Sequence, residues 1–123
     1  MNPKQQLPVI RIAIGGGAFV APELTAKIFG LTRTDAEAVF LARLFGIRDI
    51  ALGIGQMVAS SEAESLWWQL GVVCDAADAV AAVLMLKSGG PKRAGVMSAL
   101  TALNATVLGV MALTQSSSPS EAA

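Results

Sequence analysis

Apolar residues fill four long stretches of the chain, and short polar or glycine-rich connections separate them. The pattern predicts four helices, over residues 7–28, 35–59, 62–86 and 91–114. The last three have about 24 residues each, enough to cross roughly 30 Å of hydrocarbon. The first spans only if it runs to its full length or if the bilayer thins, because Arg11 interrupts its apolar run. We therefore predict an all-α fold, a four-helix transmembrane bundle with up-down-up-down topology.

The ends of the predicted helices carry boundary signals. "TDAE" at 34–37 and "SEAE" at 61–64 each fit a capping box, in which a hydroxyl and a carboxylate accept hydrogen bonds from unpaired amides. "SGGP" at 88–91 ends one helix with glycine and starts the next with proline. Trp67 and Trp68 favour an aromatic belt at the membrane interface, with packing inside the protein as the alternative.

The composition favours a single membrane domain and argues against several kinds of site. The 123 residues are 54% hydrophobic and only 15% charged, whereas soluble domains carry about 25% charged residues. Residues 1–115 form the predicted domain, and 116–123 form a polar tail that we expect to be disordered. Zero net charge argues against a nucleic-acid partner. Without histidine, and with Cys74 as its one cysteine, the chain is expected to hold no metal and no cofactor.

Basic residues gather in the first and third connections between the predicted helices. They are Lys27, Arg33, Lys87, Lys92 and Arg93. The opposite side holds Lys4, and its connection carries Glu62 and Glu64 instead. Because basic loops favour the cytoplasm, we expect a multi-pass protein in the lipid bilayer with these two loops inside and both termini outside.

Six ionisable residues fall within the apolar segments: Arg11, Arg43, Arg48, Asp49, Asp75 and Asp78. Each costs about 2.5–3.5 kcal/mol near the centre of an isolated inserted helix, so pairing or a wet cavity is expected. If the second and third segments form a hairpin about a turn near residues 60–61, position 43 lies level with 78, and 48 lies near 75. This register predicts ion pairs between Arg43 and Asp78 and between Arg48 and Asp75.

Asp49 has no equally clear partner in this register, because it points about 100° away from the arginine before it. Arg11 in the first segment is one possible partner. The last segment offers Ser98, Thr101 and Asn104, whose side chains can close a polar network inside the bundle. Ser98 and Thr101 are equally consistent with ordinary packing of small residues between membrane helices.

Glycines in the first two segments indicate close helix packing. Gly46 and Gly53 lie seven residues apart on roughly one face, with Gly55 nearby, and "GGG" occupies 15–17. No G-x-G-x-x-G follows a predicted strand, so these glycines are not a dinucleotide-binding motif.

The run "RLFGIRDIALGIG", with "APELTAKIFGL" before it and "CDAADAV" after it, resembles an uncharacterised family of small four-helix integral membrane proteins. That family is a domain of unknown function, loosely similar to DoxX-like proteins, and the resemblance covers about residues 8–113. Its most specific pattern, R-x-F-G-x-R-D-x-x-x-G, is matched by Arg43, Phe45, Gly46, Arg48, Asp49 and Gly53. The resemblance implies a four-helix membrane fold and no established activity.

Three functions fit this sequence. In the first, the protein is an accessory or structural membrane component, a homo-oligomer or part of a larger complex, and its charges form a buried Arg/Asp ion-pair layer. In the second, it is a small membrane enzyme that opens an epoxide or cyclises a lipophilic substrate by acid catalysis. In the third, it carries a small molecule across the bilayer. Whether the chain is an enzyme stays open.

The same charged residues serve each alternative. Asp49, Asp75 and Asp78 are the candidate catalytic acids; Arg11, Arg43, Arg48 and Asn104 are the candidate binding residues. A closed cavity beside the aspartates favours an enzyme, full saturation of every aspartate without a cavity favours an ion-pair lock, and a wet route to one surface favours a carrier.

Overall fold

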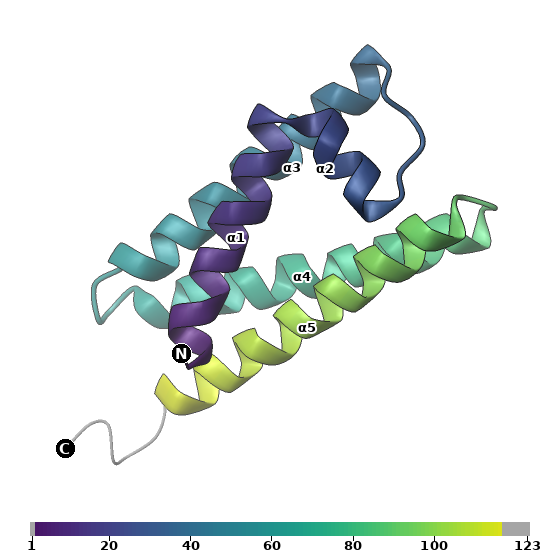
Figure 1. The fold of residues 1–123 in the computed structure, drawn as a ribbon. Helices are drawn as coiled ribbons and strands as arrows, with labels where there is room; N and C mark the ends of the chain where they lie inside the picture. The colour runs from purple at the N-terminus through teal and green to yellow at the C-terminus, as the bar shows by residue number, and fades with distance from the viewer. Residues whose placement is uncertain (1, 117–123) are drawn as a thin grey trace.

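The computed structural model describes residues 2–116, which form five α-helices and no strand. The helices are α1 (Pro3–Val20), α2 (Pro22–Phe29), α3 (Ala36–Val58), α4 (Glu64–Lys87) and α5 (Lys92–Ser116), drawn in Figure 1. The all-α prediction is confirmed, and α3, α4 and α5 start and end within two residues of the predicted segments. The predicted disordered tail lies outside the described residues, except that residue 116 ends α5.

The first predicted helix is wrong as one element, because it divides into α1 and α2 with a bend of 120° between them. Pro22 explains the break. A proline disfavours helical backbone angles in the residue before it, and Ala21 adopts φ −129° and ψ 65°. Pro22 then opens α2, where its missing N–H costs no hydrogen bond. α2 ends at Gly30, whose φ of 85° suits glycine.

The long helices form two closely packed pairs, α1 with α3 and α4 with α5. Figure 1 shows α4 and α5 running side by side, with α1 lying across them. The contact between α3 and α4 is much smaller, so these consecutive helices do not pack as the predicted hairpin. α2 contacts α1, α3 and α5, and thus bridges the two pairs at one end.

The α1/α3 pair depends on glycine. A Cβ atom built on Gly15 would lie 2.6 Å from the carbonyl oxygen of Gly46, and one on Gly46 would lie 2.5 Å from the carbonyl oxygen of Gly15. Seven residues along α3, a Cβ on Gly53 would lie 2.9 Å from the carbonyl oxygen of Pro8. These distances leave no room for a methyl group, which confirms the predicted glycine contact surface. Gly16 is the exception, because it has nothing within 4 Å.

The predicted capping boxes are wrong in detail. Asp35, not Thr34, caps α3: its Oδ1 accepts a hydrogen bond from the backbone N–H of Ala38 at 2.8 Å. That bond, together with a side-chain bond from Arg33, lowers the pKa of Asp35. At the start of α4 the N-cap residue is Ala63, which has no capping side chain.

Asp35→Ala is expected to loosen the first turn of α3, because an aspartate at this position holds an otherwise unpaired amide. Hydrogen exchange at residues 36–39 should accelerate several-fold, while Thr34→Ala should leave it unchanged. Since the folded pKa is lowered, the cap contributes fully above the ordinary aspartate pKa of about 4 and is lost as pH falls through the lowered value. Equal exchange in both variants at neutral pH would contradict this assignment.

Trp68 is not part of an interfacial belt. It is 1% exposed and forms a small apolar core with Leu7 of α1 and Ala112 of α5. Trp67 lies over Gly55 of α3, where a Cβ would meet its ring at 2.3 Å. Both tryptophans therefore pack between helices, which is the alternative reading of the sequence.

Two helices, α4 and α5, are long and apolar enough to cross a membrane, and the bent pair of α1 and α2 also qualifies if it counts as one span. α3 does not qualify, because its central turns carry three charged residues, Arg43, Arg48 and Asp49. The charges that make this helix unusual thus also set it apart from α4 and α5.

Candidate functional site

A buried arginine on α1 joins three helices. Arg11 is 2% exposed, and its guanidinium donates two hydrogen bonds to Asp75 of α4, from Nη1 to Oδ1 at 2.9 Å and from Nη2 to Oδ2. Nη1 also reaches Oδ1 of Asp49 on α3 at 3.2 Å, and Nε reaches Oε1 of Gln56 at 3.2 Å. Such a two-pronged arginine–carboxylate contact fixes orientation as well as charge.

The backbone of α4 makes room for this guanidinium at Gly71. A Cβ atom there would lie 2.8 Å from Nη2 of Arg11 and 2.5 Å from Nε2 of Gln56. Gln56 is 7% exposed, and its Nε2 is buried without a hydrogen-bond partner. Neither residue stood out in the sequence; the available signal was that Gln56 follows Asp49 by seven residues and so shares its helix face.

A second ion pair lies beside the first, between Arg48 of α3 and Asp78 of α4. The guanidinium contacts both carboxylate oxygens, at 3.0 and 2.5 Å. This pair is half-buried, and the guanidinium carbon of Arg48 sits 5.0 Å from the centre of the Phe45 ring, within range of a cation–π interaction. Nη2 of Arg48 is 3.9 Å from Oδ1 of Asp49, so the two ion pairs adjoin.

The pairing predicted from the hairpin register is wrong. Arg48, not Arg43, holds Asp78, and Arg11 takes the place that the register gave to Arg48 beside Asp75. Arg43 is exposed and its Nε donates to the carbonyl oxygen of Phe19 at 3.1 Å. The reason is that α1, not α4, packs along α3, so Arg11 enters between the two helices that the register paired directly.

One aspartate is left over, as the sequence suggested. Asp49 is 6% exposed and accepts one hydrogen bond, on Oδ1 from Arg11. Its Oδ2 accepts none from the described residues. With every group ionised, the layer holds three carboxylates, Asp49, Asp75 and Asp78, against the guanidiniums of Arg11 and Arg48. The layer is therefore one positive charge short.

A cavity of about 640 Å³ reaches this layer from the end of the molecule where α2 lies. Arg11, Asp49, Asp75 and Asp78 line its inner part. All five helices contribute walls, which are mostly apolar. The apolar walls include Ile14, Ala18, Phe29, Leu41, Ala42, Phe45, Ala81 and Met85. The site thus combines an apolar chamber with a charged inner wall.

Ser98, Thr101 and Asn104 of α5 line the same cavity as the charged layer. They form no hydrogen bond with Asp49 within the described chain, so they do not close the network expected for it. Asn104 is exposed in the cavity wall. Their hydroxyl and amide groups are available to whatever enters the chamber.

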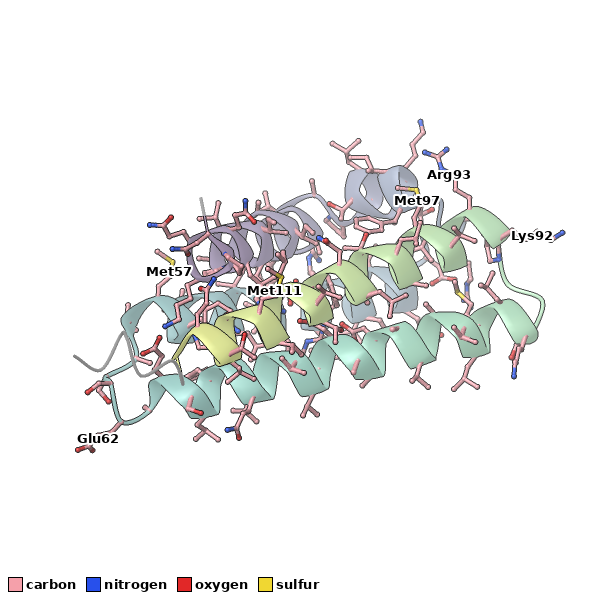
Figure 2. The ribbon with its side chains drawn as sticks, turned by 90° about the horizontal axis from the view of Figure 1, so that it is seen from below. Met57, Glu62, Lys92, Arg93, Met97 and Met111 are labelled. Carbon is pink, nitrogen blue, oxygen red and sulfur yellow. The ribbon has the colours of Figure 1, made fainter. Side chains whose placement is uncertain are left out.

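The outer end of the cavity lies near both basic connections. Nη2 of Arg93 on α5 donates to the carbonyl oxygen of Ile28 on α2 at 3.4 Å, which brings the two connections together. Figure 2 shows Lys92 and Arg93 at this end and Glu62 at the other. Between residues 2 and 116, no group of three or more histidine, cysteine, aspartate or glutamate side chains is arranged to hold a metal ion.

A comparison with protein families finds a match over most of the chain. The model of the family described as Domain of unknown function (DUF4267) matches residues 9–113. No curated protein and no solved structure matches the chain.

Proposed function

The chain belongs to the DUF4267 family of unknown function, and from its geometry we propose an integral membrane protein that binds a lipophilic small molecule in its interhelical cavity. The observation that carries the proposal is the cavity itself. Its volume of about 640 Å³ falls within the roughly 300–1,000 Å³ of small-molecule sites, and its lining is apolar with a few polar groups at one end.

The distribution of side-chain size supports the membrane location. Apart from Leu7, Leu52 and Trp68, the buried hydrophobic residues are all alanines, whereas large apolar side chains face outward from α3, α4 and α5. The outward-facing set includes Phe40, Leu44, Ile47, Val73, Val80, Leu84, Leu100 and Val107. Water solvates such a surface poorly, while hydrocarbon accepts it, and small residues between helices are typical of membrane bundles. We therefore infer that α1, α3, α4 and α5 span the bilayer as four helices.

The ends of the molecule support an orientation. The two connections rich in basic residues lie together, at the end that holds Lys92 and Arg93 in Figure 2. The helix arrangement is thus compatible with up-down-up-down topology, and by the positive-inside rule we place this end in the cytoplasm. The cavity then opens toward the cytoplasmic half of the bilayer.

The ion-pair lock and the enzyme make different demands on the three aspartates. Asp75 and Asp78 are each held on both oxygens by an arginine, as expected of an ion-pair lock. A lock alone would not require a cavity, and the cavity reaches these residues. An acid catalyst would need a carboxyl group free to face the substrate, and Asp49, with one oxygen unbonded in the cavity lining, is the residue that fits. Enzyme activity is therefore the second candidate function, with Asp49 as its acid.

A cavity-blocking substitution tests the proposal. Ala81 and Ala76 are both exposed alanines of α4, but Ala81 lines the cavity and Ala76 does not. Ala81→Trp is expected to fill part of the chamber and to lower labelling by a photoreactive dodecanol analogue at least tenfold in lipid nanodiscs. Ala76→Trp is the matched control and should label like the wild type, with the label on cavity residues in peptide mass spectrometry. Undiminished labelling of the Ala81→Trp protein would refute a ligand site here.

A further inference from the structure

The charges that line the cavity are strongly unbalanced, although the whole chain is neutral. The acidic residues are Glu23, Glu37, Asp49, Asp75 and Asp78, and the basic ones are Arg11 and Arg33. Arg48 adds one positive charge from just behind the lining, where it pairs with Asp78. No lysine lines the cavity. An electronegative chamber in a neutral protein favours a positively charged occupant.

The excess negative charge is carried by acidic residues along the cavity, from its mouth to its inner wall. Asp75 and Asp78 are saturated by arginines, and Arg33 pairs with Asp35 outside the cavity. In the part of the chain that the structure describes, Glu23 and Glu37 form no ion pair. Asp49, which is 6% exposed, keeps one oxygen without a hydrogen bond.

From this arrangement we propose that the cavity binds a lipophilic monocation, an alkyl amine whose ammonium group pairs with Oδ2 of Asp49. The inference rests on the proposed function, because it assigns a chemical class to the ligand of that cavity. The apolar walls would hold the hydrocarbon part, and the ammonium would supply the positive charge that the Arg/Asp layer lacks. The hydroxyl and amide groups of Ser98, Thr101 and Asn104 could accept from the remaining N–H groups.

The test compares three probes of equal chain length, dodecylamine, dodecanol and dodecanoate, on the full chain in nanodiscs. Isothermal titration calorimetry measures the affinity of each probe. The amine should bind at least tenfold more tightly than the alcohol. Dodecanoate should bind most weakly. Empty nanodiscs correct for partition into lipid.

Asp49→Asn should bring amine affinity down to that of the alcohol, while alcohol binding persists. The matched control is Glu62→Gln, which removes the same formal charge from the exposed α3–α4 turn, at the end of the molecule far from Lys92 and Arg93 (Figure 2). It should behave like the wild type. If Asp49→Asn does not fold, the amine preference of the wild type still decides the question.

The outcomes separate the two proposals. Equal affinity for amine and alcohol would overturn the monocation proposal and leave a lipophile site intact. Tighter binding of dodecanoate would also overturn it and would point to the arginines as the ligand's partners. Absence of binding by all three probes would refute the proposed function together with the inference that rests on it.

Discussion

Arg11→Met is expected to destroy most of the folded protein. The substitution leaves Asp49 and Asp75, 6% and 4% exposed, without the guanidinium that neutralises them. Removing one partner of a buried ion pair costs about 3–5 kcal/mol, and here two carboxylates lose the same partner. Since whole domains are stable by only about 5–15 kcal/mol, folded yield in gel filtration and the unfolding temperature should both fall sharply.

Arg43→Met supplies the matched control, because Arg43 is an exposed arginine with a single hydrogen bond to a backbone carbonyl. Its effect should stay within about 1 kcal/mol. Combining Arg11→Met with Asp49→Asn and Asp75→Asn should restore part of the yield, since the charges that lost their partner are removed as well. An Arg11→Met protein that unfolds at the same temperature as Arg43→Met would show that the layer carries no stability.

Gly46→Ala is expected to have the second largest effect, through the α1/α3 contact. The new methyl group would lie 2.5 Å from the carbonyl oxygen of Gly15, which belongs to a helix backbone and cannot rotate away. The helices must separate, and overpacking of this kind costs about 1–3 kcal/mol. Because Arg11 lies one turn from Gly15 on α1, separation also lengthens its hydrogen bond to Asp49.

Gly16→Ala is the control from the neighbouring position on α1. With nothing within 4 Å, its methyl group meets no obstacle, and exchanging glycine for alanine inside a helix should stabilise it by about 0.5–1 kcal/mol. The two variants should therefore shift the unfolding temperature in opposite directions. A Gly46→Ala protein as stable as Gly16→Ala would mean that α1 and α3 do not approach as closely as described.

Much of the fold follows from the sequence, because the length of each uninterrupted apolar run gives the length of the helix. The extents of α3, α4 and α5 and the contact role of Gly46 and Gly53 were predictable from apolar runs and glycine spacing. The break before α2 was less accessible. Pro22 ends the apolar run, but a proline can open a new helix or kink an old one, and only the direction of α2 distinguishes them.

The charged layer was predictable in most of its members and not in its pairs. Five of the six ionisable residues in the apolar segments gather in one layer. Asp49 is the carboxylate without an arginine of its own. Matching residues by depth gives the wrong partners because it ignores helix rotation and the helix that intervenes. Arg11 reaches Asp75 only because Gly71 opens a gap in α4, and a gap made by a missing side chain leaves little trace in a hydropathy pattern.

The division into two helix pairs has a mechanical consequence. At one end, the pairs are held together by apolar contact among Leu7, Trp68 and Ala112. Further along, the pairs are joined by Arg11–Asp75 and Arg48–Asp78, whose attraction weakens as water raises the local dielectric constant. Because the cavity reaches these ion pairs, an apolar occupant would strengthen their attraction and water in the cavity would weaken it. The strength of the contact between the two helix pairs therefore depends on what fills the cavity.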